Sequence, residues 1–239
     1  MAITSFWVYF NARPLFWIVV TIAAYLLAQM LNRKAGGTAL LHPVLVAMLM
    51  IITLLTLSGT DYDTYFEGAQ FIHFLLGPAT VALAIPLFDH RARIRRMLLS
   101  LAVVCLSGSL VAVVTTLAIG QLFGGSPGLL LSLAPKSVTS PIAIGISEQI
   151  GGFPSLSAGL SLTTGMIGCL LAPLVFRTLG IRSETSRGFA LGLAAHGFGT
   201  AYAMQQSTLA GAFAGLAMGV TGVFSSVLIP LVVRLFGIA

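Results

Sequence analysis

Long apolar stretches separated by short polar links run along this chain. The uninterrupted apolar stretches cover about residues 14–31, 43–57, 71–88, 97–123, 156–179 and 209–236. Most of them approach or exceed the roughly 17 to 25 residues that an α-helix needs to cross a bilayer. The pattern predicts an all-α polytopic membrane protein. With the interrupted stretches between residues 124 and 208 included, we expect about six to eight transmembrane helices.

The first interruption is APKSVTSPIAIGISEQI at residues 134–150, which places a lysine between two prolines. Pro135 cannot donate a helical hydrogen bond, and Pro141 biases Ser140 away from the α region. We therefore expect residues 136–140 to be non-helical. A half-helix should follow, with Ser140 as its N-cap and Pro141 as its first residue.

The second interruption is AAHGFGTAYAM at residues 194–204. Gly197 and Gly199 permit unusual backbone angles or close approach, and Thr200 could cap a following half-helix. His196 could donate a hydrogen bond or carry a proton, or it could be a satisfied structural histidine. Both roles for His196 remain open.

The two interruptions also correspond to each other when the chain is compared with itself at an offset of 57 residues. PLVFRTLGI at 173–181 then lies on PLVVRLFGI at 230–238, and Thr139 lies on His196. This suggests a duplicated unit of one broken helix plus one long span. Transporters often carry such units as inverted repeats, which we favour, although a direct repeat remains open.

Composition narrows the class of protein. The chain is 57% hydrophobic and 8% charged, whereas soluble domains carry about a quarter charged residues. Its formal charge of +6 is spread over short links rather than one basic stripe, so we expect no nucleic-acid partner. Cys105 and Cys169 lie inside apolar stretches without metal or redox spacing, so we expect packing residues and no cofactor. No catalytic motif is present, and we expect no enzyme.

The distribution of basic residues bears on topology, because such residues favour the cytoplasmic side. With the N-terminus outside, the basic run DHRARIRR at 89–96 lies inside. If residues 126–153 crossed the membrane fully, Arg177, Arg182 and Arg187 would lie outside. The charges therefore favour a re-entrant hairpin at residues 126–153.

The first interruption also carries the candidate chemistry. A half-helix N-terminus favours an anion, and Lys136 adds a full charge. At the bilayer centre a lysine costs about 2.5 to 3.5 kcal/mol, so it needs an aqueous cavity, a partner or an anionic ligand. Lys136 could instead snorkel to the surface or pair with Glu148. The candidate binding residues are Lys136, Ser137, Thr139, Ser140, Pro141, His196, Gly197, Gly199 and Thr200.

Small residues form stripes at helical spacing in the last two long apolar stretches. The first stripe is Ser157, Ser161, Gly165 and Cys169, and the second is Gly211, Gly215 and Gly219. Such faces let helices approach closely. We expect tight packing there, which is compatible with a sliding surface for a moving domain.

Three motifs give the chain a family resemblance. APKSVTSPIA at 134–143, IGGFP at 150–154 and AAHGFGTA at 194–201 resemble the LrgB/CidB family of bacterial membrane proteins, and the resemblance covers nearly the whole chain. It implies a multi-pass protein of the bacterial cytoplasmic (inner) membrane. The chain departs from the family pattern at His42, where relatives commonly carry asparagine, and at Tyr202, where they often carry arginine.

The resemblance implies two functions. Some members are named as antiholin-like regulators of murein hydrolase export and autolysis that act with a small LrgA/CidA-type membrane partner. Others, including a plastid relative, are associated with transport of glycolate, glycerate or pyruvate.

We expect a secondary or facilitative transporter of small organic anions, built as a single membrane domain over residues 1–239 and assembled as a dimer in the lipid bilayer. Residues 1–125 would form a scaffold, against which the broken-helix region at 126–239 moves in an elevator-like manner. The alternative is a holin-like or antiholin-like membrane protein. A third alternative is an accessory subunit that is inactive without its small partner.

Overall fold

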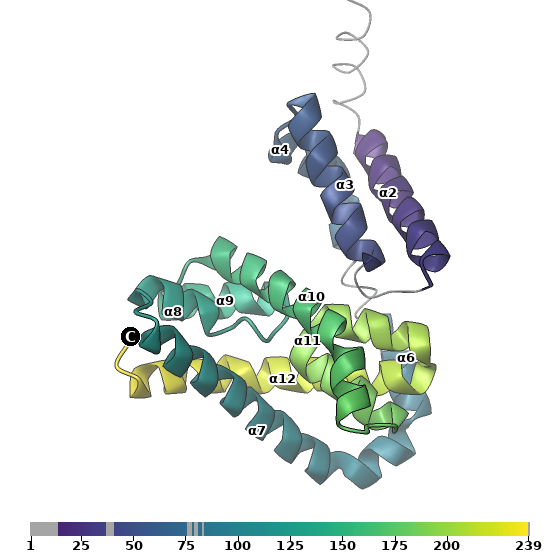
Figure 1. Cartoon of the computed structure of the whole chain (residues 1–239). Helices are drawn as coiled ribbons and strands as arrows, with labels where there is room; N and C mark the ends of the chain where they lie inside the picture. The colour runs from purple at the N-terminus through teal and green to yellow at the C-terminus, as the bar shows by residue number, and fades with distance from the viewer. Residues whose placement is uncertain (1–13, 37–40, 76–77, 79–80, 83, 239) are drawn as a thin grey trace, which may run out of the picture. The chain divides into compact units, whose positions relative to one another are not determined.

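The computed structural model describes residues 14–36, 41–75, 78, 81–82 and 84–238, and every regular element among them is a helix (Figure 1). The helices are α2 (Pro14–Lys34), α3 (Pro43–Ser58), α4 (Tyr62–Phe74), α6 (Ala84–Asp89), α7 (Arg91–Leu122), α8 (Pro127–Leu133), α9 (Ser140–Ile150), α10 (Pro154–Thr178), α11 (Glu184–Gln206) and α12 (Thr208–Leu235). The chain divides into two compact units, one up to Ala82 and one from Leu83 onward.

Four of these helices, α2, α7, α10 and α12, are long and apolar enough to cross a membrane. The apolar helix α3 is shorter, with 16 residues. The outer face of α7 exposes large apolar side chains such as Leu99 and Val111, which suits a lipid environment. The structure therefore supports a polytopic helical membrane protein, while the count of six to eight crossing helices stays a prediction.

The first unit is built around the packing of α2 on α3. Ala24 and Ala28 of α2 meet Ala47 of α3 in a small buried cluster. Trp17 is fully buried, and its ring lies edge-on to Tyr65 of α4 with the ring centroids 5.5 Å apart. The hydroxyls of Thr21 and Tyr65 lie 3.1 Å apart, which adds a polar contact between α2 and α4.

The acidic stretch at residues 58–70 begins at the last residue of α3 and continues through a short link into α4. The N–H of Thr64 donates to Oδ1 of Asp61 at 2.7 Å, and this bond holds the pKa of Asp61 below its usual value. The apolar stretch expected over residues 71–88 lies partly outside the described residues. Within it, α4 ends at Phe74 and α6 begins at Ala84.

In the second unit, α12 is the most deeply buried of the four long helices and packs along α11, α7 and α9. Val113 of α7, Val138 and Ile229 of α12 belong to one apolar cluster. Phe189 of α11 and Phe213 of α12 belong to another. The same compact unit contains α7 and the broken helices, so α7 lies beside the region predicted to move. The predicted division between residues 125 and 126 stays a prediction.

Glycines bring α11 and α12 into close contact, but they lie mainly on α11. A Cβ added at Gly188 would lie 2.1 Å from the carbonyl oxygen of Ala210, and one at Gly192 would lie 2.0 Å from that of Ala214. In the stripe predicted on α12, Gly211 faces Met204, whereas Gly219 has nothing within 4 Å. The predicted close packing of helices is confirmed. It depends most on Gly188 and Gly192 of α11, which the predicted stripe on α12 did not include.

Candidate functional site

The first interruption is a helical hairpin. The helix α8 ends at Leu133, residues 134–139 form a turn, and α9 begins at Ser140. Ser157 Oγ lies 2.9 Å from the carbonyl oxygen of Ser132 on α8 and 2.8 Å from Ser147 Oγ on α9, so α9 runs back beside α8. The predicted break is confirmed. Its N-cap is Thr139, one residue before the predicted Ser140, and Pro141 lies within the first two residues of α9.

Buried hydroxyls hold the open end of this hairpin on α10. Ser132, Ser147 and Ser157 are all fully buried. Ser132 Oγ donates to the carbonyl of Gly128 at 2.7 Å and accepts from the N–H of Phe153 at 2.8 Å. These bonds join α8, α9 and α10 into one polar cluster within an otherwise apolar surrounding.

We expect Ser157→Ala to destabilise the protein by about 1 to 3 kcal/mol, because it leaves the buried Ser147 hydroxyl without its partner. The measurement is the midpoint of thermal unfolding in detergent. Ser155→Ala is the matched control, since Ser155 is exposed two residues earlier on the same helix. Equal midpoints for both variants would contradict a stabilising role for the hydroxyl cluster.

The turn of the hairpin also rests on α10. Ser161 Oγ donates to the carbonyl of Val138, and Ser140 Oγ donates to the carbonyl of Ala158 at 3.4 Å. The predicted small-residue stripe on α10 is buried along its length. Ser157 and Ser161 in that stripe therefore hold the open end and the turn of the first hairpin.

The second interruption is a sharp reversal within α11 at His196. His196 has φ 38° and ψ −118°, the only positive φ of a non-glycine residue in the described part of the chain. A Cβ added at Gly199 would lie 2.1 Å from the carbonyl oxygen of Leu191. Residues eight apart in a continuous helix are separated by about 12 Å. Residues 184–195 and 197–206 are thus two arms of a second hairpin.

The predicted roles around this break are partly corrected. The unusual backbone angle falls on His196 rather than on Gly197. A Cβ added at Gly197 would have nothing within 4 Å. Gly199 allows the close approach that was expected of it. Thr200 does not cap the second arm, because its hydroxyl donates to the carbonyl of His196 at 2.8 Å, as a residue one turn into a helix does.

His196 is buried between the second hairpin and α10. Its imidazole lies against the backbone of Ser161, and a Cβ added at Gly165 would lie 2.7 Å from its Cε1 atom. Nε2 of His196 has no hydrogen-bond partner among the described residues. Ser161 therefore contacts both hairpins, through its hydroxyl at Val138 and through its backbone at His196.

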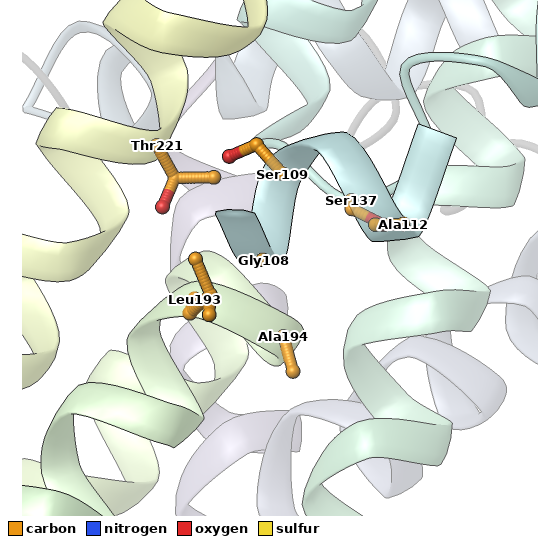
Figure 2. Close-up of a pocket in the computed structure, with 7 residues that line it drawn as sticks. All are labelled: Gly108, Ser109, Ala112, Ser137, Leu193, Ala194 and Thr221. Atoms are coloured by element: carbon orange, nitrogen blue, oxygen red, sulfur yellow. The ribbon is translucent and has the colours of Figure 1, made fainter. Parts of the chain in front are cut away.

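The turn of the first hairpin and the end of the first arm of the second hairpin line a cavity of about 140 Å³ (Figure 2). Its lining residues are Gly108, Ser109 and Ala112 of α7, Ser137 of the first turn, Leu193 and Ala194 of α11, and Thr221 of α12. Among the predicted site residues, only Ser137 lines it. Ser109 and Thr221 were not among the predicted site residues. The one feature of the sequence that could have indicated them is that each is a hydroxyl residue inside a long apolar stretch.

The cavity suits a molecule of a few heavy atoms, since sites for drug-sized ligands occupy about 300 to 1,000 Å³. Three of its lining residues, Ser109, Ser137 and Thr221, carry hydroxyls, and the surface of the cavity is mostly apolar. In the same turn, the first N–H groups of α9 carry no side-chain cap, so they lack partners within the helix. The described residues contain no group of three His, Cys, Asp or Glu that could hold a metal.

Lys136 lies in the turn beside Ser137 and is partly buried. Glu148 lies on the exposed side of α9. No ion pair joins Lys136 to Glu148 within the part of the chain that the structure describes. One alternative for this lysine, the ion pair with Glu148, is thus not formed. The others are an aqueous cavity, an anionic ligand and the membrane surface.

Four long apolar helices and two helical hairpins define a polytopic helical membrane protein. The chain belongs to the LrgB-like family, whose sequence profile matches residues 21–235. It is 35% identical to the holin-like protein CidB of Staphylococcus epidermidis over 222 residues, which cover 92% of this chain and 95% of that protein.

Two further relatives match to a similar extent. YxaC of Bacillus subtilis is 37% identical over 221 residues, covering 92% of this chain and 96% of its own. The antiholin-like protein LrgB of Bacillus mycoides is 30% identical over 224 residues, covering 94% and 97%. No solved structure matches the chain. The names of these relatives support the holin-like or antiholin-like interpretation better than the transporter interpretation.

Proposed function

We propose that the chain is a secondary or facilitative transporter of small organic anions, of the pyruvate, glycolate or glycerate class, in the bacterial cytoplasmic membrane. One observation carries the proposal: both hairpins contribute to the wall of one small, mostly apolar cavity whose lining residues include Ser109, Ser137 and Thr221. A selective transporter needs such a site of ligand size between movable elements. A cavity of this volume does not by itself form a wide pore.

The carboxylate would bind at the first turn. The uncapped N–H groups of α9 and the ammonium group of Lys136 both favour an anion. Two oxygens of a carboxylate can accept from both kinds of donor at once. The hydroxyls of Ser137, Ser109 and Thr221 would contact the rest of the ligand.

The two hairpins support a duplicated and movable design. The order of hairpin then long helix occurs twice, as α8–α9 followed by α10 and as the two arms of α11 followed by α12. We infer that each hairpin re-enters the membrane and that the two units are a repeat, with the inverted relation favoured. Residues 126–239 would move in an elevator-like manner against residues 1–125 within a dimer.

A second candidate function is that of a holin-like or antiholin-like protein that modulates murein hydrolase export and autolysis. The names of the relatives CidB and LrgB favour it. In that case the cavity would belong to a regulated pore or to a contact with a small LrgA/CidA-type membrane partner. An accessory subunit without activity of its own is the related case, in which the partner is required.

Reconstitution separates these candidates. The pure protein in proteoliposomes should take up labelled pyruvate, glycolate or glycerate with saturation, while an entrapped dye stays inside. Leakage of dyes of several sizes without saturation would reject the transporter and favour the holin-like function. Uptake that appears only after co-reconstitution with the small partner would identify an accessory subunit.

A further inference from the structure

We propose that Ser109 is a specificity-determining residue of the cavity, whose hydroxyl hydrogen-bonds an oxygen on the second carbon of the ligand. The inference rests on the proposed function and deepens it. It concerns the part of the ligand beyond the carboxylate, which the N–H groups of α9 and the ammonium group of Lys136 do not contact. The ligand class it implies is a small carboxylate with a hydroxyl or keto oxygen on C2.

The hydrogen bonding of Ser109 differs from that of its neighbours on α7. Ser107, Thr115 and Thr116 each donate to the carbonyl four residues earlier, at 2.8, 2.6 and 2.6 Å. This is the usual way in which a hydroxyl is satisfied inside an apolar helix. Ser109 Oγ instead has no hydrogen-bond partner among the described residues, although Ser109 is only 3% exposed.

The orphaned hydroxyl lies in the wall of the cavity. Figure 2 shows Ser109 pointing its oxygen toward the side of Thr221 of α12, while Ser137 lies on the other side of Ser109, next to Ala112. Thr221 is 2% exposed, and its hydroxyl lies 3.6 Å from the sulfur of Cys105, a weak partner. Ser109 thus places a buried hydroxyl with hydrogen-bonding capacity to spare at the wall of the cavity.

Packing holds Ser109 at this place. A Cβ added at the neighbouring Gly108 would lie 2.7 Å from Cδ2 of Leu193, so α7 approaches the second hairpin closely there. Ser109 is therefore presented to the cavity by a helix that is tightly packed, rather than by a loop. A site built to bond a ligand oxygen discriminates strongly against an analogue without it.

The test compares glycolate with acetate, which differ only by the hydroxyl on C2. In proteoliposomes, we expect Ser109→Ala to raise the KM for glycolate about 3- to 10-fold, the effect of losing one neutral hydrogen bond, and to change acetate uptake less than 2-fold. Ser107→Ala is the matched control, because Ser107 is exposed on the same helix and bonded to the carbonyl of Val103. It should behave as the wild type.

Other outcomes overturn the inference. If Ser109→Ala changes neither ligand, or weakens both equally, the hydroxyl bonds its own helix or only supports packing. A glycolate-dependent rise in the thermal midpoint, measured in parallel, separates binding from transport. If the wild type takes up neither acid but glycolate still raises its thermal midpoint, and Ser109→Ala abolishes that rise, the transport proposal is wrong and the Ser109 subsite is supported. If the protein takes up glycolate and Ser109→Ala does not change the uptake, the transport proposal is supported and the Ser109 subsite is wrong.

Discussion

Lys136→Ala should lower the uptake of small organic anions at subsaturating concentration by about 10- to 100-fold. Hydrogen bonds to charged groups contribute about 1.5 to 3 kcal/mol, and each 1.4 kcal/mol is a factor of ten. Lys136 lies in the turn beside the cavity residue Ser137 and makes no ion pair with Glu148 in the described part of the chain. Removing the ammonium group should therefore lower the affinity for the ligand without breaking an ion pair with Glu148.

The controls use the few lysines of this chain. Lys34 and Lys136 are its two lysines, and Lys34 lies exposed at the end of α2, so Lys34→Ala should leave uptake unchanged. Lys136→Arg keeps the charge but changes its geometry and should retain part of the activity. A Lys136→Ala protein that unfolds at the wild-type temperature and takes up substrate normally would remove Lys136 from the site. That result would also weaken the case for a transporter.

The sequence predicted the two hairpins because local rules dominate at both positions. Pro135 and Pro141 bracket residues that cannot continue a helix, and the turn lies at 134–139, which begins two residues and ends one residue before the predicted 136–140. The glycines around His196 marked the second break, because glycine weakens a helix wherever it falls. Local chemistry did not reveal which residue would take the strained angle, and it fell on the histidine.

The walls of the cavity could not be predicted in this way. Ser109 and Thr221 lie 112 residues apart, in apolar stretches whose pattern only indicates spanning helices. Their meeting depends on how α7 and α12 pack, which is a long-range property. The same limit applies to the glycines of α11, since Gly188 and Gly192 gain their importance only when α12 lies against them. The candidate chemistry near the prolines was therefore easier to identify than the cavity that the hairpins complete.

Gly192→Ala should destabilise the second unit severely. The added Cβ would lie 2.0 Å from the carbonyl oxygen of Ala214 and 2.7 Å from its backbone carbon. Backbone atoms of a buried helix cannot move aside as a flexible side chain can, so α11 and α12 must separate. Overpacking of this kind costs about 1 to 3 kcal/mol and occasionally more, and here we expect at least the upper value.

For a chain of this size, such a loss should lower the midpoint of thermal unfolding by roughly 6 to 12 °C, measured by the loss of monodisperse protein in detergent after heating. The matched control is Gly197→Ala on the same helix, where nothing lies within 4 Å and the backbone angle is ordinary. It should change the midpoint by less than about 2 °C. If Gly197→Ala is the more damaging of the two, the second hairpin needs glycine for its backbone angle at residue 197 rather than for contact with α12.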